Sequence, residues 1–599
     1  MSNNHLRLPF SVCAGCFALI FAVRLHLVAL AGFAHPYWDQ WGFEGTTIIQ
    51  PFLERKLTLA HLFTAENEHR LVLSRLTQLA LVTLDGGFWD CLAQAVMNVG
   101  LFAFFGTILI SQLFRLARGL ERWLLPILLL AIFCSPLGFQ NTLWGISACW
   151  YFLIFGSLFA IVAVSESSPF SVRWFFGLAA AVASFLGMAG GVITPAICAG
   201  ITFVRWLQLR RDFKTHVLAI ITWLALAAGL FAATPRVPGN QLAATSVWEF
   251  CSLILESLAF PFTQKFFSIP TIIIIALLGT AALISRRPTR WKNGDFAILG
   301  ILLWLLGQIF ALAYGRGHGG IPHRYHELLV LFGPFVITGL AILPRLFGVG
   351  KAVTVSSQLL LAGVLLTFLV GLTRRTTEAW TLLIPQRSAV FAVQEANLRS
   401  FVRTDDVDAF RKLSADQTGS YQGADVMSRI LRTGALRAAL APSIREPVPV
   451  IDGETKQPLD EPFSWVALKT AQLADPQAGH RYLVICQTRS WPGVWARLLA
   501  LRQGFSLRPG PDRNGSHSLE LITNDLNRLR RAEVLERLGA DSFLLPREVG
   551  PVGSAVRSLL AFSPILLVAG ILGLVLCALA LFIRRTPRNV ANAPTKTAS

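Results

Sequence analysis

Long apolar segments alternate with shorter polar ones along most of the 599-residue chain. A membrane-spanning helix needs about 20 largely apolar residues, and twelve segments approach that length. The predicted spans cover residues 10–33, 92–114, 123–139, 146–165, 172–188, 190–206, 217–233, 268–285, 296–314, 327–345, 353–372 and 557–583. The pattern predicts an all-α polytopic membrane domain of about twelve transmembrane helices.

Two further apolar segments are not counted as spans. Residues 246–262 carry Glu249 and Glu256, and they are predicted to form an outer-surface helix or a re-entrant piece. Residues 70–84 are short for a span and have Arg75 near their middle. This second segment is predicted to lie in the membrane interface with its apolar face down.

Basic residues indicate the direction of the spans. The clusters at 115–122, 205–214, 286–292, 345–351 and 584–588 all follow even-numbered spans. Because cytoplasmic loops are enriched in Lys and Arg, both termini are predicted to be cytoplasmic and the first loop to face outward. The net charge of +19 is spread over these short loops. We therefore expect contact with membrane lipids and no binding of nucleic acid.

The composition changes after the eleventh span. Residues 1–372 form the predicted membrane domain, whose outer loop covers 34–91. Residues 373–555 are polar, with short apolar runs at 482–486, 519–522 and 543–545 typical of buried strands and a helical pattern at 525–538. They predict a mixed α/β periplasmic domain, followed by a last transmembrane helix and cytoplasmic tail at 556–599.

The first outer loop gathers titratable residues beside aromatic ones. Asp39 lies within Tyr-Trp-Asp-Gln-Trp, and Trp38 belongs to a residue type that prefers the headgroup level of a bilayer. A carboxylate there is a candidate base for an enzyme with a lipid-linked substrate. Asp39 can instead be a helix cap or a solvated loop acid. Further along the loop, the candidate residues are Glu44, Glu66, Glu68, His69 and Arg70.

The loop between the ninth and tenth spans, YGRGHGGIPHRYHE at 314–327, is rich in basic and aromatic residues. Short outer loops usually avoid arginine, so Arg316 and Arg324 need a particular role. A guanidinium can hold two phosphate oxygens at once, which makes them candidates for a donor phosphate. Anchoring of lipid headgroups is the alternative. Tyr325 and His318 lie in the same loop.

Three polar or aromatic residues follow the third span and are candidates for binding a sugar. Gln140 and Asn141 carry amides that can bind sugar hydroxyls, and Trp144 can stack on a sugar face or serve as an interfacial anchor. Arg24 lies within the first span, where an ionisable group is costly unless it faces a cavity. It is predicted to mark the groove beneath the first outer loop, to pair with an acid or to snorkel to the interface.

An acidic residue just after the first span, in an outer loop with interfacial helices, resembles the arrangement of the GT-C superfamily of membrane glycosyltransferases. That superfamily includes protein mannosyltransferases, lipid A aminoarabinose transferases and mycobacterial arabinosyltransferases. Four motifs over residues 10–372 are similar to those of poorly characterised bacterial multi-pass members, namely WDQW at 38–41, NEHR at 67–70, NTLWG at 141–145 and YGR with RY at 314–325. Many members carry a second acid beside the first, whereas Gln40 follows Asp39 here.

The resemblance implies an inverting transfer of a sugar from a polyprenyl-phosphate donor to a glycan or lipid acceptor at the outer face of a bacterial inner membrane. Asp39 would be the catalytic acid, and Glu44 or Glu68 a second carboxylate or a metal ligand. No cofactor is required by the pattern, and a divalent metal is left open. An O-antigen polymerase or ligase is one alternative, and a lipid-linked glycan transporter, which would favour midplane polar residues and internal repeats, is another.

Overall fold

The fold is described from a computed structural model of the 599-residue chain. The structure describes residues 8–209, 212–236, 240–284, 291–348, 350–411, 423–475, 480–510 and 517–585. Several basic residues of the predicted cytoplasmic loops lie outside these ranges, namely Arg210, Arg211, Arg286, Arg287, Arg290 and Arg588.

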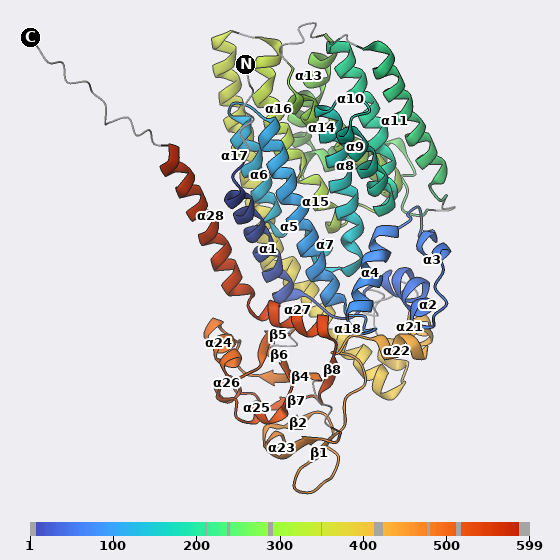
Figure 1. Ribbon diagram of the computed structural model, residues 1–599, viewed down its shortest axis with the longest axis vertical. Coiled ribbons are helices and arrows are strands. Elements are labelled where there is room, and N and C mark those ends of the chain that lie inside the picture. The colour runs from blue at the N-terminus through green and yellow to red at the C-terminus, as the bar shows by residue number, and fades with distance from the viewer. Residues whose placement is uncertain are drawn as a thin grey trace, which may run out of the picture.

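The body of the protein is a bundle of long apolar helices (Figure 1). Within the described ranges, ten helices are long and apolar enough to cross a membrane, or eleven if the bent pair 121–133 and 136–143 forms one span. Their main segments are α1 (Phe10–Ala31), α5 (Cys91–Leu116), α8 (Ala148–Glu166), α10 (Ile193–Leu209), α11 (Phe213–Ala233), α13 (Ser268–Ile284), α14 (Asn293–Arg316), α16 (Phe332–Phe347), α17 (Lys351–Glu378) and α28 (Ser563–Arg585). The chain is therefore a multi-pass membrane protein.

Each predicted span coincides with a helix, but three of them differ in form. The third is bent by 41° between α6 (Glu121–Phe133) and the segment containing α7 (Phe139–Leu143). The fifth, α9 (Val172–Gly187), is only 16 residues long. The predicted start of the last span at 557 is wrong, because α27 (Pro551–Ala561) is a separate helix and α28 begins at Ser563.

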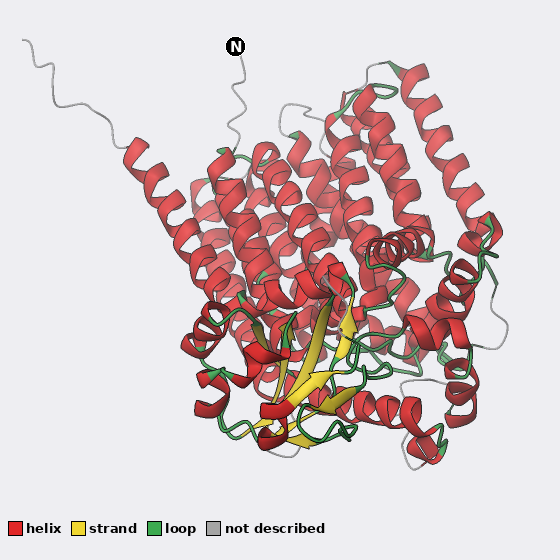
Figure 2. Ribbon diagram, turned by 60° about the horizontal axis from the view of Figure 1, so that its bottom comes forward, coloured by secondary structure: helices red, strands yellow, loops and turns green. Residues whose placement is uncertain are grey.

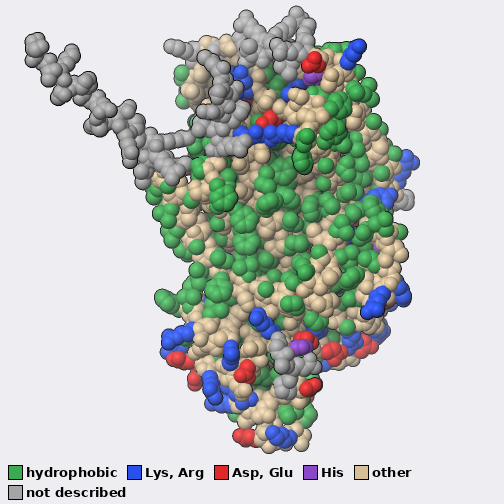
Figure 3. All heavy atoms as spheres, in the orientation of Figure 1, with side chains coloured by type: hydrophobic (Ala, Val, Ile, Leu, Met, Phe, Trp, Pro, Cys, Tyr) green, Lys and Arg blue, Asp and Glu red, His purple; other side chains and the backbone are tan. Residues whose placement is uncertain are grey.

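The first and last spans pack antiparallel. Ser11 at the start of α1 accepts a hydrogen bond from Cys577 of α28 at 3.3 Å, and His26 further along α1 lies 3.3 Å from Ser563. The start of α1 and the end of α28 therefore lie at one end of the bundle, opposite the sheet-containing region (Figures 1 and 2). A broad band of hydrophobic side chains covers the middle of the visible face, between two ends that carry charges (Figure 3).

Short helices fold the first outer loop against the bundle. The chain continues from α1 into a π-helix, η1 (Trp41–Ile49), then α2 (Gln50–Leu53), α3 (Leu59–Phe63) and α4 (Val72–Leu84). The helix predicted at 70–84 is present as α4, and that predicted at 246–262 is present as α12 (Val247–Ala259). Arg75 of α4 is buried, because its guanidinium bonds the carbonyls of His61, Leu62 and Thr64.

The eleventh span continues beyond its predicted end. A π-helical turn, η7 (Ala379–Leu383), joins α17 directly to α18 (Ile384–Thr404). The chain then forms α19 (Asp408–Arg411), α21 (Ala424–Leu431) and α22 (Gly434–Ala439). Buried residues from Phe391 to Ile444 share the hydrophobic core of the helical bundle. The change of composition at residue 373 therefore does not coincide with a change of core.

The sheet-containing region has its own core, formed by buried residues between Val450 and Leu545. All its strand pairs are antiparallel, in the order β2-β7-β4-β6-β5, with β8 paired to β4 and β1 paired to β3. The strands are β1 (Val450–Asp452), β2 (Phe463–Ser464), β3 (Ala471–Leu473), β4 (Arg481–Thr488), β5 (Ser506–Pro509), β6 (His517–Thr523), β7 (Ser542–Phe543) and β8 (Arg547–Val549). The accompanying helices are α23 (Trp465–Thr470), α24 (Val494–Arg502), α25 (Leu526–Arg530) and α26 (Glu533–Arg537).

The three predicted strands are present as β4, β6 and β7. The single helix predicted at 525–538 is wrong, because α25 ends at Arg530 and α26 begins at Glu533. Both short helices place apolar residues in the core of the sheet region. The break between them lets each one pack against that core separately.

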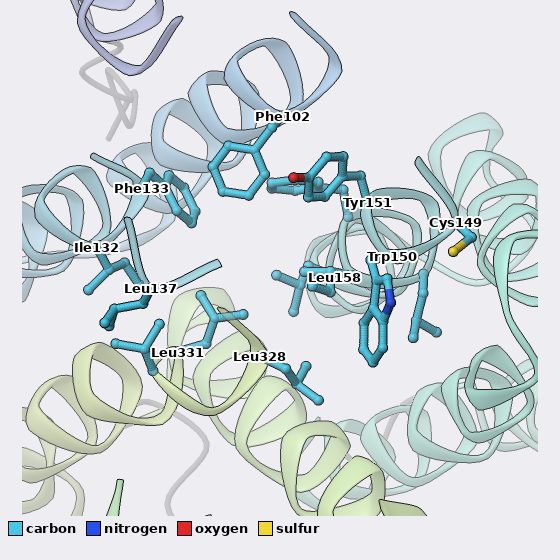
Figure 4. Packing of buried hydrophobic residues seen from close by; sticks show 14 of the residues in the cluster. Phe102, Ile132, Phe133, Leu137, Cys149, Trp150, Tyr151, Leu158, Leu328 and Leu331 are labelled. Carbon is cyan, nitrogen blue, oxygen red and sulfur yellow. The ribbon is translucent and has the colours of Figure 1, made fainter. Parts of the chain in front are cut away.

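Aromatic side chains pack the centre of the helical bundle. The ring of Phe102 on α5 lies 5.2 Å from that of Phe133 on α6 and 5.0 Å from that of Tyr151 on α8, both edge to face. Leu328 and Leu331 approach the same cluster from the chain around α15 (His326–Leu329) (Figure 4). Four separate helical segments thus meet beneath the loops that carry the candidate residues.

Candidate functional site

A cavity of about 330 Å³ lies where loops from distant parts of the chain meet. Its wall is formed by the loop after α1, by α7, by the end of α14 with the following 3-10 turn η6 (His323–Tyr325), and by α18. The lining residues are Tyr37, Trp38, Gln140, Leu143, Trp144, Leu242, Arg316, Pro322, His323, Arg324, Arg387 and Phe391. Most are aromatic or apolar, and three are arginines.

Arg316 and Arg324 both reach this cavity. Their guanidinium groups each lie 5.7 Å from the ring centroid of Tyr325, and Arg324 also lies 5.7 Å from the Trp144 ring. Among the described residues, neither guanidinium has a hydrogen bond or an acidic partner within 4.0 Å. Two cations without an acidic partner at ion-pair distance, in a largely apolar cavity, favour binding of an anion.

Asp39 lies within the electrostatic reach of these two arginines. It is half-buried at the start of the π-helix η1, and its carbonyl accepts the Phe43 N–H at 2.7 Å. Burial raises the pKa of its carboxyl group from 3.8 to about 6, although Arg324 and Arg316 act to lower it. A carboxylate with a pKa near the working pH is suited to accept a proton.

The backbone before Asp39 is unusual. Trp38 has φ = 51°, a left-handed conformation that a bulky residue seldom adopts. Its ring stacks on that of Tyr37 with centroids 5.4 Å apart. π-helical segments such as η1 are rare and are frequently found at functional sites. The strained residue and the π-helix together set the place of the acid between them.

The second acidic cluster of the loop lies close to the first. Arg75 holds Glu66 at 3.3 Å, and burial raises the pKa of Glu66 to about 7, with the nearby Asp39 charge acting in the same direction. His69 Nδ1 accepts the Ala189 N–H at 3.4 Å, and its Nε2 lies 3.5 Å from the exposed Glu68.

The hydrogen bond at His69 Nδ1 decides which nitrogen carries the proton. Because burial lowers the pKa of His69, the ring is neutral near pH 7, and its single proton lies on Nε2, facing Glu68. His69 therefore offers a proton donor rather than a base in this arrangement, with the Glu68 carboxylate 3.5 Å from its Nε2.

Glu44 does not line the cavity. Its carboxylate is fully buried, where it accepts hydrogen bonds from Gln40 at 3.0 Å and from Gln94 at 3.1 and 3.2 Å. Burial raises its pKa to about 7. Glu44 was predicted as a catalytic residue, but its burial among amide groups separates it from any substrate in the cavity. Glu44 instead holds the side chain of Gln40, the residue that follows Asp39, by accepting its hydrogen bond.

Asn141 also differs from its predicted role in binding substrate. Its side chain is fully buried and donates to the carbonyl of Arg324 at 2.8 Å and to the carboxylate of Glu327 at 3.0 Å. Arg24 of α1 forms an ion pair with the same carboxylate at 2.6 Å. The amide therefore holds the loop that carries Arg324 and does not face a sugar. Arg24 pairs with an acid, which is one of the three alternatives predicted for it.

Gln140 and Trp144, the other two residues predicted after the third span, do line the cavity. The indole N–H of Trp144 donates to the Tyr37 carbonyl at 3.1 Å, which joins α7 to the loop after α1. Arg387 was not predicted. It donates to the Tyr37 hydroxyl at 2.8 Å from α18, a segment that composition had assigned to a separate domain.

Two other predicted residues make contacts elsewhere. Arg70 donates to the carbonyls of Phe63 at 2.6 Å and Ala233 at 3.1 Å, so its guanidinium is engaged by backbone. His318 is exposed and lies 3.4 Å from Glu249 of α12. Neither residue lines the cavity.

The described part of the chain contains no group of three or more His, Cys, Asp or Glu side chains placed to hold a metal ion. Asp39, Glu44 and Glu68 therefore do not form a metal-ligand set, and no step below depends on one. Comparison of the chain with protein-family models, with curated protein sequences and with solved structures found no match.

Proposed function

We propose that the chain is an inverting glycosyltransferase of the GT-C type, which moves a sugar from a polyprenyl-phosphate donor to a glycan or lipid acceptor. In this proposal the cavity faces the outer side of a bacterial inner membrane, the chain crosses twelve times, and both termini are cytoplasmic. The basic loops after the even-numbered spans support this orientation. The observation that carries the proposal is one titratable acid within electrostatic reach of two arginines that have no acidic partner within 4.0 Å among the described residues.

The arginines are suited to the leaving group. When the bond between the anomeric carbon and the phosphate oxygen breaks, its electron pair stays on the phosphate and negative charge develops there. Arg316 and Arg324 can stabilise this charge without supplying a proton, because a guanidinium stays protonated. The apolar lining of the cavity strengthens the interaction by excluding water.

Asp39 is suited to the attacking group. In its ionised form it accepts the proton of the acceptor hydroxyl while that oxygen forms the new bond to the anomeric carbon. Attack on the side opposite the phosphate inverts the configuration of that carbon. The pKa of about 6 leaves most of the carboxyl ionised at pH 7 and keeps it basic enough to take a proton. Trp38 and Trp144 offer ring faces for the sugar.

The substitution Asp39→Asn tests the proposal. The purified full-length protein would be assayed with a panel of polyprenyl-phosphate sugars for release of polyprenyl phosphate. In cells, the surface glycans of a strain that lacks the gene would be compared by mass spectrometry with those of the same strain after the gene is restored. We expect Asp39→Asn to insert normally and to lose activity by at least about 100-fold, the usual contribution of a general base. Asp425→Asn, which changes an exposed acid that does not line the cavity, is the matched control. Turnover by Asp39→Asn equal to that of the control would remove Asp39 from the mechanism.

An O-antigen polymerase or ligase is the second candidate. Arg387 gives the cavity a third arginine, which accords with a class that uses several outer arginines and lipid-linked oligomers. Supplying monomeric and oligomeric lipid-linked sugars separately distinguishes the two functions. Transfer from the monomer alone supports the glycosyltransferase, and elongation from the oligomer supports the alternative.

A further inference from the structure

Two buried arginines lie where the sheet region meets the first span, and they differ in their partners. Arg508 of β5 forms an ion pair with Glu520 at 3.0 Å and donates to the carbonyl of Gly32 at 2.7 Å. Its charge is compensated by an acid and by the end of α1. Arg497 of α24 is buried to a similar degree, with 4% of its surface exposed.

Arg497 has no such compensation. Among the residues that the structure describes, no acid lies within 4.0 Å of it, and its buried Nε and Nη1 atoms have no hydrogen-bond partner. Burial lowers its pKa, and the nearby positive charge of Arg508 does so further. A buried charge without a partner is costly. An anion bound at this place would remove that cost.

The position of Arg497 indicates where such an anion would come from. Arg497 lies within electrostatic reach of His26, which is part of the first membrane span and contacts Ser563 at the start of the last one. Helix α24 lies beside the lower end of α28 in Figure 1. The guanidinium is therefore located where two lipid-facing helices leave the bilayer.

The surface around α24 also fits a bilayer. Trp495 is 83% exposed, and Trp491 and Val494 are exposed beside it. Tryptophan prefers the headgroup level of a membrane, because its ring is apolar and its N–H is polar. Exposed tryptophans in the same short segment as a buried, unpaired guanidinium are expected of a surface that rests on lipid headgroups.

We propose that Arg497 binds the phosphate of an anionic phospholipid in the outer leaflet, at the junction of α24, α1 and α28. The Trp491 and Trp495 side chains enter the headgroup layer beside it. The site anchors the sheet region to the membrane surface and is separate from the cavity that contains Arg316 and Arg324. It does not depend on the proposed glycosyl transfer.

The test is a lipid titration of the purified full-length protein in neutral detergent. Thermal unfolding would be followed while dipalmitoyl-phosphatidylglycerol, the matching phosphatidylcholine or inorganic phosphate is added. We expect phosphatidylglycerol to stabilise the protein most, and Arg497→Gln to weaken its apparent affinity by about tenfold or more through loss of a charge-assisted contact. Arg502→Gln removes the same charge from an exposed position on the same helix and is the matched control.

Three responses to the added lipids or phosphate would overturn the proposal. The first is an equal response of Arg497→Gln and Arg502→Gln to phosphatidylglycerol. The second is equal stabilisation by phosphatidylcholine and phosphatidylglycerol. The third is stabilisation by inorganic phosphate to the same extent, which would assign the arginine to a soluble anion. Without added lipid, Arg497→Gln should be at least as stable as the wild type, because it removes an uncompensated charge. A variant that fails to fold without lipid would likewise contradict the proposal.

Discussion

Glu327 links the buried Arg24 of α1 to the loop that carries Arg324. One carboxylate oxygen forms an ion pair with the Arg24 guanidinium at 2.6 Å, and the other accepts a hydrogen bond from the Asn141 amide at 3.0 Å. Because Asn141 also holds the carbonyl of Arg324, the acid is one contact removed from a cavity arginine. The substitution Glu327→Gln keeps the shape of the side chain and removes its charge.

The expected cost follows from the burial of the pair, since both side chains are at most 6% exposed. Removing one partner of a buried ion pair costs about 3–5 kcal/mol. Arg24 would keep its hydrogen bonds to the Phe133 carbonyl at 2.9 Å and the Thr142 hydroxyl at 2.9 Å, so we expect the lower end of that range, about 3 kcal/mol. A neutral interhelical hydrogen bond in a membrane is worth only about 0.6 kcal/mol on average. The measured cost therefore shows whether Arg24 and Glu327 stabilise the protein as a buried ion pair or only as a neutral hydrogen bond.

A double-mutant cycle measures the difference. Wild type, Glu327→Gln, Arg24→Met, Glu327→Met and the double Met variant would be unfolded in mixed detergent micelles and followed by tryptophan fluorescence. We expect a coupling energy above about 2 kcal/mol, because the double variant leaves no uncompensated charge. Glu256→Gln, which neutralises an exposed acid of α12, is the control and should unfold like the wild type. Costs that add to within about 0.5 kcal/mol would refute the ion pair as a stabilising unit.

Three further predictions concern protons and loop position. First, kcat/KM for transfer should rise about tenfold per pH unit up to about 6 and then level off, because Asp39 must lose its proton to act as a base; a flat profile between pH 5 and 8 contradicts this. Second, burial raises the pKa of Glu44 from 4.5 to about 7, so its stabilising effect is present below pH 4.5 and is lost as the pH rises through 7. From pH 5 to 8 the wild type should lose roughly 2–3 kcal/mol more unfolding free energy than Glu44→Gln, as measured by denaturant titration, and equal losses contradict this. Third, Asn141→Ala should raise the KM for the lipid-phosphate donor about tenfold with a smaller effect on kcat, because it frees the loop of Arg324; an effect on kcat alone contradicts this.

The long helices could be predicted because the requirement for a span is local. About 20 apolar residues in a row satisfy the bilayer wherever their neighbours lie, so every predicted span coincides with a helix. The boundaries that differ depend on contacts between segments. The break at Phe562 and the continuation of α17 through η7 cannot be recognised from the number of consecutive apolar residues.

In the candidate site, too, the features that depend on local sequence could be predicted and those that depend on contacts between distant segments could not. Arg316 and Arg324 were predicted because arginine is unusual in a short outer loop. The orientation of Asn141 could not be predicted, because Glu327, which turns its amide inward, is 186 residues away. Arg387 was missed for a related reason, since its place at the cavity requires the eleventh span to continue through η7 into α18.

The place of Asp39 depends on parts of the chain that lie far beyond the membrane domain predicted from composition. Arg508 bonds the Gly32 carbonyl at 2.7 Å, and Gln394 lies 3.1 Å from the ring of His35. Arg387 bonds the Tyr37 hydroxyl at 2.8 Å. Three contacts from α18 and β5 thus hold the loop that leads from α1 to the acid, because a loop of this kind has little regular structure of its own to fix it. The chain after residue 372 is therefore part of the framework of the site.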